Sequence, residues 1–404
     1  PPMLTLLEVV AWIVALATAV PCLVFFVECV LGSLVPHRAR IVGDQPGPRV
    51  AVLVPAHNES AGVTPTLTGL RAQLGPQDRL VVIADNCTDD TAAVAAQSGA
   101  TVIERHDATR RGKGYALAFG LEHLVQDPPA VVIIVDADCI VGPGSLAQLA
   151  SMASELDRPV QADYVLEPPS RPQGLAVVSA LAFLVKNRVR PRGLLALGMP
   201  CLLTGTGMAF PWEVIRKAPP TDDNLVEDMV MGLALAQLGY APMLCAEARV
   251  ASVLPDRQQA AASQRKRWEH GHLATLREYA PKLIGQGLRQ GRTDLIALAL
   301  DLMVPPLSLL VALLIGALGF TAVATWFGAS PFPFAIAFAN LFAIGIGVLL
   351  AWFAHGRTLV RARDLGAIPL YVLWKIPLYF SFFTKGRHAS WDRTERSAGG
   401  EPKP

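Results

Sequence analysis

Two carboxylates in the sequence Asp136-Ala137-Asp138 are the first candidates for chemistry in the chain. They follow the apolar run 131–135, so both side chains would emerge where a buried strand ends. Carboxylates held this close repel each other, and burying them is costly without a cation. A hard divalent ion that also binds a diphosphate would offset that cost. The pair therefore predicts a metal site, with a surface turn after a strand as the alternative.

Asp85 ends a second apolar run, 80–85, and a polar segment follows it. A carboxylate at the carboxyl end of a parallel strand can accept hydrogen bonds from a ribose or a base. Helix capping by Thr88 or Asp89 is the simpler explanation of the polar segment, and it is compatible with a binding role because Asp85 precedes the cap. Asp85 is therefore a candidate for binding a nucleoside.

Lys113 lies in the segment 110–114, of sequence Arg-Arg-Gly-Lys-Gly, which opens a predicted helix. The segment resembles a phosphate loop, but no Ser or Thr follows the lysine, so we reject an NTPase. A lysine near a helix N-terminus could still bind a diphosphate. A solvated basic turn is the alternative interpretation.

Two further motifs are charged. Glu227 and Asp228 precede an apolar helix, where acidic residues also simply suit a helix N-terminus. Gln264, Arg267 and Trp268 lie in a basic stretch. Taken alone, that stretch is most simply a helix at a membrane surface, with the tryptophan as an interfacial anchor.

The pattern of strands and helices predicts an α/β domain over residues 48–255. Short β-branched runs occupy 50–55, 80–85, 100–104 and 130–136, and helix-like segments lie at 61–73, 88–98, 112–125 and 143–154. Alternation of this kind, with near-continuous Val and Ile strands, is typical of a buried, mostly parallel sheet. Ligands of such sheets bind beyond the carboxyl ends of the strands, where the candidate residues lie.

The composition indicates a membrane protein. The 404 residues are 52% hydrophobic and only 17% charged, and the mean hydropathy is +0.39. The uncharged runs 9–27, 302–327 and 332–354 are each about as long as the roughly 20 residues that a bilayer core requires. Basic residues follow the first run, precede the second and follow the third, which places the middle of the chain in the cytoplasm.

A fourth apolar run, 367–384, is a poorer span because it carries Pro369, Lys375 and Pro377. Basic residues flank it on both sides, so the positive-inside rule argues against a crossing. We expect this segment to lie in the interface or to re-enter the membrane.

Several classes of protein are disfavoured. A net charge of +2 argues against nucleic acid as a partner, and six scattered cysteines offer neither a zinc site nor a disulfide framework. A transporter or receptor with a nucleotide-sensing domain is the rival of another class. The long soluble insertion and the scarcity of polar residues in the spans argue against transport, with Asp301 as the only candidate.

Taken together and in this order, the motifs resemble the membrane-bound family 2 glycosyltransferases, which include cellulose, hyaluronan and chitin-oligosaccharide synthases and ceramide glucosyltransferases. The matched stretch runs from Val-Leu-Val-Pro-Ala-His-Asn-Glu at 52–59 to Trp268, over half of the chain. The resemblance implies a GT-A fold with a mostly parallel sheet, inserted between transmembrane helices. It also implies a nucleotide-diphosphate sugar, expected to be UDP-linked, as donor and Mg²⁺ or Mn²⁺ as cofactor.

On the donor side, the resemblance implies that Asp85, with Glu59 nearby, contacts the nucleoside. Asp136 and Asp138 would contact donor and metal, with Asp138 the direct ligand. Lys113 joins this group as a candidate for binding the diphosphate.

On the acceptor side, Asp228 matches the aspartate of the family's T-E-D motif, the general base, although Val226 replaces the threonine. Glu227 belongs to the same motif, and Gly205 lies in a segment that resembles the acceptor-side loop. Gln264, Arg267 and Trp268 match Q-x-x-R-W, which binds the diphosphate and lines the acceptor site.

The expected function is inverting transfer of a hexose to a growing polysaccharide or oligosaccharide at the cytoplasmic face of the inner membrane. A non-processive lipid glycosyltransferase, with a ceramide-type or polyprenyl-type acceptor, is the alternative. Three spans are fewer than the large synthases use to form a channel. A full channel would therefore need an export partner or a homo-oligomer.

The predicted organisation has five parts. They are an N-terminal transmembrane helix (1–40), a cytoplasmic GT-A domain (41–255), basic interfacial helices (256–294), a transmembrane hairpin (295–355), and an interfacial or re-entrant segment with the tail (356–404).

Overall fold

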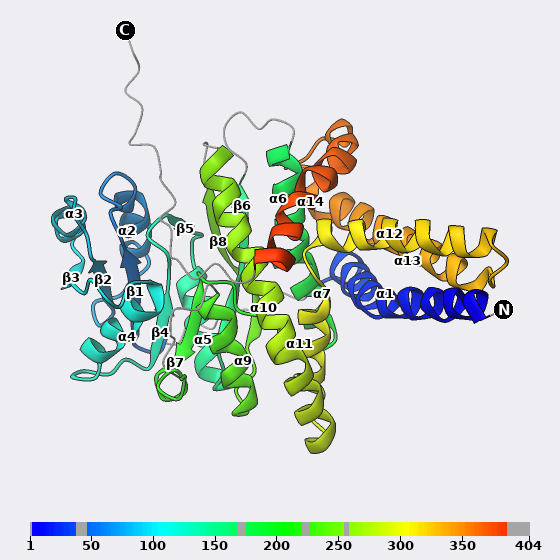
Figure 1. Ribbon diagram of the computed structural model, residues 1–404. Coiled ribbons are helices and arrows are strands. Elements are labelled where there is room, and N and C mark those ends of the chain that lie inside the picture. The colour runs from blue at the N-terminus through cyan, green and yellow to red at the C-terminus, as the bar shows by residue number, and fades with distance from the viewer. Residues whose placement is uncertain (1, 38–46, 168–174, 220–225, 254–257, 386–404) are drawn as a thin grey trace, which may run out of the picture. The chain divides into compact units, whose positions relative to one another are not determined.

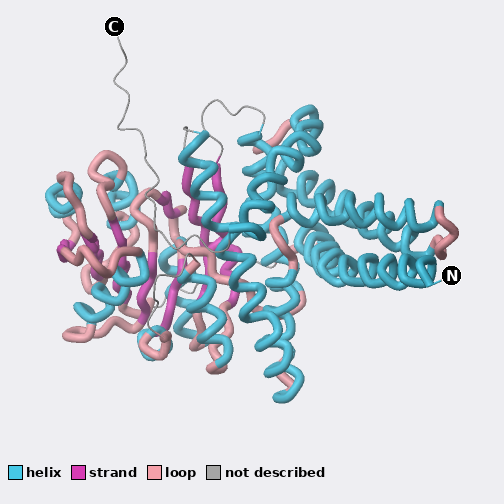
Figure 2. Tube along the Cα trace, in the orientation of Figure 1, coloured by secondary structure: helices cyan, strands magenta, loops and turns pink. Residues whose placement is uncertain are grey.

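The computed structural model describes residues 2–37, 47–167, 175–219, 226–253 and 258–385 (Figure 1). The chain forms two compact units. Unit 1 comprises Pro1–Pro36, Ser170–Gly198 and His272–His388, and unit 2 comprises His37–Pro169, Met199–Gly271 and Ala389–Pro404. The described strands, magenta in Figure 2, all belong to unit 2, whereas the regular elements described in unit 1 are helices.

Unit 2 is built on a sheet with the strand order β3-β2-β1-β4-β7-β6-β8-β5 among the described residues. Its elements in chain order are β1 (Val50–Ala56), α2 (Val63–Arg71), β2 (Arg79–Asp85), α3 (Thr91–Gln97), β3 (Thr101–Arg105), α4 (Lys113–Leu124), β4 (Val131–Ile134), β5 (Cys139–Val141), α5 (Ser145–Leu156), β6 (Val160–Glu167), β7 (Met208–Pro211), α8 (Trp212–Ile215), α9 (Glu227–Gln237), β8 (Met243–Val253) and the start of α10 (Gln258–Gln290).

The four strands expected from the sequence form the parallel half of this sheet. Val52 of β1 lies opposite Leu80 of β2 and Ile133 of β4, and β3 pairs in parallel with β2. Strands β1, β2 and β4 are buried almost throughout and their apolar side chains form the core of the unit, whereas β3 is a more polar edge strand. The predicted α/β fold and its four helices, α2 to α5, are confirmed.

Beyond β4 the sheet is mixed. Strand β7 runs antiparallel to β4 and β6, whereas β6 and β8 are parallel to each other and β5 is antiparallel to β8. Strand β4 also ends earlier than predicted. Its ladder stops at Ile134 and Val135 makes one more hydrogen bond to Leu53, so Asp136 lies in the following turn instead of on the strand.

Unit 1 contains the long apolar helices. Its elements are α1 (Pro2–Leu34), α6 (Leu175–Leu184), η1 (Val185–Val189), α7 (Arg190–Ala196), the rest of α10, α11 (Thr293–Met303), α12 (Leu307–Trp326), α13 (Phe332–Ala351), η2 (Trp352–Gly356), η3 (Ala362–Ala367) and α14 (Ile368–Lys385). Among the described residues, three helices are long and apolar enough to cross a membrane: Met3–Leu34, Leu307–Trp326 and Phe332–Gly356. They coincide with the three predicted spans. The fourth run forms α14, and its relation to the bilayer stays a prediction.

A buried ion triad connects three helices of unit 1. Arg190 of α7 donates to Glu28 of α1 at 2.6 Å and pairs with the carboxylate of Asp301 of α11. All three residues are buried, so breaking the triad would leave a charge without a counterion in an apolar interior. Gly32 and Gly193 let α1 and α7 approach so closely that a Cβ at either position would meet the opposite backbone.

The structure corrects one predicted boundary. The sequence assigned 41–255 to a single domain, whereas Ser170–Gly198 lies in unit 1. The physical reason is that α6 is almost wholly apolar, and Leu181 and Leu184 of α6 and Val189 of η1 pack in one cluster with Phe25 of α1. The segment therefore packs with the apolar helices of unit 1.

Candidate active site

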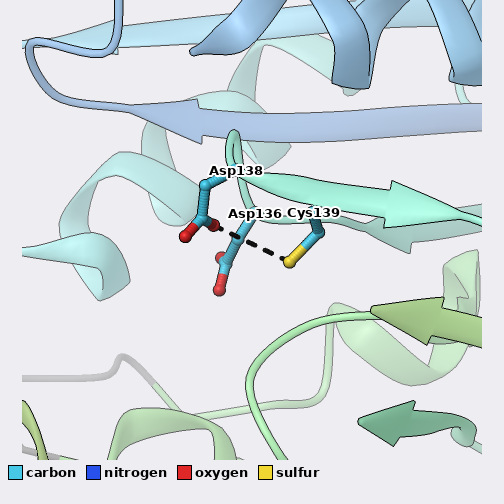
Figure 3. Close-up of side chains that lie close together, drawn as sticks. All are labelled: Asp136, Asp138 and Cys139. Atoms are coloured by element: carbon cyan, nitrogen blue, oxygen red, sulfur yellow. Dashed lines mark hydrogen bonds between the residues drawn. The ribbon is translucent and has the colours of Figure 1, made fainter. Parts of the chain in front are cut away.

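The turn between β4 and β5 brings together the first candidate residues. Figure 3 shows the side chains of Asp136, Asp138 and Cys139 gathered there, with ligand atoms within 4.8 Å of one another. Two hydrogen bonds fix the turn from outside. The hydroxyl of Thr66 on α2 donates to the Ala137 carbonyl at 2.9 Å, and the Asp136 N–H donates to Thr206 Oγ1 at 3.0 Å.

The donor set of this turn suits a hard divalent cation. Asp136 and Asp138 offer carboxylate oxygens, which Mg²⁺ and Mn²⁺ prefer. Burial raises the pKa of the Cys139 thiol well above its usual value, which disfavours the thiolate form that binds metals. The residues present therefore fit such an ion through the two carboxylates.

Lys113 is the cation at the centre of the site. It is the first residue of α4, and its ammonium pairs with Asp136 and donates to the Gly205 carbonyl at 2.6 Å. Burial alone would lower the pKa of Lys113, but Asp136, Glu227 and Asp228 together raise it above its usual value. Lys113 is thus a cation paired with Asp136, whereas Arg110 and Arg111 before it are exposed, and its role toward a diphosphate stays a prediction.

The loop Thr204–Gly207 joins Lys113 to the predicted base. Gly205 and Gly207 both have left-handed backbone, with φ of +93° and +63°. A Cβ at Gly205 would lie 3.2 Å from Asp228 Oδ2 and 3.8 Å from Lys113 Nζ. Asp228 therefore lies against the same loop that the lysine contacts.

Glu227 and Asp228 form the first turn of α9. The positive end of the helix dipole stabilises both carboxylates there, and Lys113 adds to that effect. The simple explanation offered by the sequence, that acids suit this helix end, is consistent with their placement but does not account for the lysine that they face.

The predicted nucleoside residue, Asp85, lies at the end of β2 and is buried against Arg105 of β3. The two make an ion pair at 2.6 Å, and Arg105 also donates to the Arg110 carbonyl at 2.7 Å. His57 Nδ1 donates to the Asp85 carbonyl at 2.6 Å, and the neighbouring Glu59 N–H donates to Thr91 at 2.8 Å. Hydrogen bonds therefore link the segment after β1 to the end of β2 and to α3, and the binding roles of Asp85 and Glu59 stay predictions.

Three predicted residues lie on α10. Arg267 and Trp268 are half-buried, whereas the side chain of Gln264 lies outside the described residues. Their roles stay predictions.

Sequence reasoning missed three side chains that hold the site: Thr66, Arg105 and Gln161. Only Arg105 carried a usable signal, because it is a basic residue that ends a strand next to the strand of Asp85. The other two are ordinary polar residues whose partners lie far away along the chain.

Comparisons with known proteins define the class. Residues 48–271, more than half of the chain, match the family described as "Glycosyltransferase like family 2". The chain is 27% identical over 370 residues to the uncharacterized glycosyltransferase YaiP of Escherichia coli, and the aligned residues cover 86% of each protein. It is 32% identical over 112 residues to the low-salt glycan biosynthesis hexosyltransferase Agl6 of Haloferax volcanii, covering 27% of this chain and 26% of that one.

A solved structure shows the same fold. The mannosyltransferase PcManGT from Pyrobaculum calidifontis, in complex with GDP-Man and Mn²⁺, superposes with a TM-score of 0.57 at 19% identity, over 94% of this chain and all of that one. The chain belongs to the family 2 glycosyltransferases and is a glycosyltransferase of the GT-A fold.

Substituting Gly205 by alanine tests the contact with Asp228. The new Cβ would press on Asp228 Oδ2 in a backbone conformation that costs about 1–3 kcal/mol for a residue other than glycine. We expect kcat, followed as nucleoside diphosphate release from the donor, to fall by at least about 10-fold, because a misplaced reacting group costs up to about 100-fold.

Gly239→Ala is the matched control. Gly239 has a similar φ of +101°, and a Cβ there would meet nothing within 4 Å. Equal losses of activity in the two variants would show that backbone strain, and not the contact with Asp228, is responsible.

Proposed function

We propose that this glycosyltransferase moves a hexose, with inversion, from a UDP-linked sugar to the hydroxyl of a growing polysaccharide or oligosaccharide at the cytoplasmic face of the membrane. One observation carries the proposal: Lys113, Asp136 and Asp228 converge on the single loop that contains Gly205. A candidate base thus lies beside the residues assigned to the donor.

The donor half of the site has separate groups for each part of a nucleotide sugar. Asp85 and Glu59, at the ends of β2 and β1, would bind the nucleoside, and Lys113 would bind the diphosphate. Asp138, together with Asp136, would hold Mg²⁺ or Mn²⁺. When bound, that ion stabilises the negative charge of the departing diphosphate. The complex of PcManGT with GDP-Man and Mn²⁺ supports a donor and a metal of these classes.

The acceptor half supplies the base. In the proposed step, the Asp228 carboxylate takes the proton of the acceptor hydroxyl while the acceptor oxygen bonds to the anomeric carbon. The bond from that carbon to the diphosphate oxygen breaks, and the diphosphate leaves with the electron pair. Lys113 lies close enough to Asp136 and Asp228 to offset the charge of both carboxylates. Because these acids raise the pKa of Lys113, the lysine stays protonated and does not take the proton of the acceptor hydroxyl.

The family resemblance supports the remaining assignments. The acceptor would contact Gly205, Glu227 and Trp268. The diphosphate would contact Gln264 and Arg267. The contact of Gly205 with Asp228 supports the first of these assignments.

The membrane assignment extends the three candidate spans. Basic residues on the same side of each span favour a multi-pass protein of the inner membrane with unit 2 in the cytoplasm, where nucleotide sugars are found. Lipid headgroups would then contact the basic part of α10.

A lipid acceptor is the second candidate function. The observation in its favour is that the described residues provide three candidate spans, few for a polysaccharide channel within one chain. A single transfer to a ceramide-type or polyprenyl-type lipid needs no channel, whereas export of a polymer would need a partner or a homo-oligomer.

Replacing Asp228 by asparagine tests the base. The amide keeps the shape of the side chain but cannot take a proton, so we expect transfer to fall by about 10²- to 10⁴-fold. Affinity for the nucleoside diphosphate should stay within about threefold, a change below about 0.7 kcal/mol. Asp157→Asn, at an exposed helix end, is the control and should keep full activity. Near-normal transfer by Asp228→Asn would refute the assignment.

The length of the product separates the two acceptors. The full chain in lipid nanodiscs, supplied with UDP-glucose, UDP-galactose, UDP-N-acetylglucosamine, UDP-glucuronate and GDP-mannose in turn, identifies the donor by nucleotide release. With that donor labelled, we expect a ladder of saccharides on a gel. A single labelled glycolipid would reject chain extension and support the lipid acceptor.

A further inference from the structure

Gln161 of β6 is a buried residue whose carboxamide is fully committed to backbone. Its Oε1 accepts from the Thr204 N–H at 2.9 Å. Its Nε2 donates to the Thr206 carbonyl at 2.9 Å and to the Ala162 carbonyl at 3.0 Å. The residue is only 2% exposed, so water does not compete for these bonds. One amide therefore holds the loop Thr204–Gly207 on both sides of Gly205.

The loop needs this side chain because the sheet ladder does not reach it. Strand β7 begins at Met208, which lies opposite Gln161, and the last ladder-like bond beyond it joins the Ala162 N–H to the Gly207 carbonyl at 2.8 Å. Upstream of that point Gly205 and Gly207 take left-handed backbone, which turns the chain out of the sheet. Backbone groups that leave a ladder in a buried place require other partners, and Gln161 supplies them.

The same loop makes three contacts with the proposed catalytic machinery. The Gly205 carbonyl accepts from Lys113 Nζ, and Thr206 Oγ1 accepts from the Asp136 N–H. The α-carbon of Gly205 lies against Asp228. A shift of the loop would therefore move a cation, the turn that carries the metal-binding carboxylates and the base together.

We propose that Gln161 is a positioning residue for glycosyl transfer, which holds Lys113, Asp136 and Asp228 in register through the loop Thr204–Gly207. It touches neither donor nor acceptor itself. The inference rests on the proposed function for the roles of those three residues. It adds the group that sets their relative positions.

Gln161→Met is the first test, because methionine has nearly the same length and shape but no amide. We expect kcat to fall by about 10- to 100-fold, since small misplacements of reacting groups have effects of that size. The Kd for the nucleoside alone, uridine or, if GDP-mannose is the donor, guanosine, should change by less than about threefold, because the nucleoside is assigned to Asp85, whose ion pair with Arg105 does not involve the loop.

Gln73→Met is the matched control. Gln73 also bridges backbone groups with its carboxamide, accepting from the Leu146 N–H and donating to the Val141 and Gly69 carbonyls, and none of these belongs to the loop. It should keep kcat within about twofold, even if its thermal unfolding temperature falls as far as that of Gln161→Met.

Gln161→Glu gives a readout that a purely structural role would not move. The introduced carboxyl keeps the acceptor for Thr204, but when ionised it faces the carbonyls of Thr206 and Ala162 without a proton to donate. When protonated it regains one donor, and burial raises its pKa toward neutrality. The ratio of its kcat to that of the wild type should therefore rise at least about fivefold from pH 8 to pH 6, well within the roughly hundredfold limit that a single titration sets over two pH units.

Measuring both enzymes at each pH removes the titration of Asp228 and other native groups from this ratio. A flat ratio for Gln161→Glu, or a kcat for Gln161→Met within about twofold of the control, would overturn the inference. If Gln161→Met does not fold, the pH ratio of Gln161→Glu decides alone. Loss of transfer in Asp228→Asn with normal Gln161 variants refutes only the positioning role, whereas an active Asp228→Asn refutes the proposed base.

Discussion

The site depends on the electrostatic interaction of the Lys113 ammonium with the carboxylates around it. Asp136, Glu227 and Asp228 all act on this one cation, and Asp138 lies beside Asp136. Carboxylates gathered this closely would repel one another or take up protons without a positive charge among them. The position of the ammonium is also constrained, because it contacts both the Gly205 carbonyl and the Asp136 carboxylate. Lys113 thereby holds together the turn after β4, the start of α4 and the loop Thr204–Gly207.

Unit 1 also contains a cation shared by several carboxylates, but there it connects helices. There a single guanidinium, Arg190, meets the carboxylates of Glu28 and Asp301, and the three helices that carry them are otherwise held by apolar packing. A charged residue near an apolar helix is costly unless it is paired. The triad thus links α1, α7 and α11 within unit 1, in addition to the apolar packing that places Ser170–Gly198 there.

The sequence was sufficient for the parts of the structure that rest on local pattern. Strands β1 to β4, their helices and the three spans follow from runs of Val and Ile and from bilayer-length apolar segments. The rest depends on contacts between distant residues. Strand β7 is four residues long, Glu28 follows an apolar run without any sign of its partner, and Gln161 looks like any polar residue on a strand. Family motifs named Asp136, Asp138 and Asp228, but only the fold shows Lys113 and Gly205 between them.

Isothermal titration of UDP and GDP with the purified full chain, with and without Mn²⁺, tests the central claim that this acid-rich site binds a nucleotide together with a divalent ion. The wild type should bind one nucleotide at least about tenfold more tightly with Mn²⁺, which corresponds to about 1.4 kcal/mol. In Asp138→Asn the nucleotide should still bind through Asp85, but Mn²⁺ should improve its affinity by less than about twofold. A full Mn²⁺ effect in Asp138→Asn, or none in the wild type, would contradict the account.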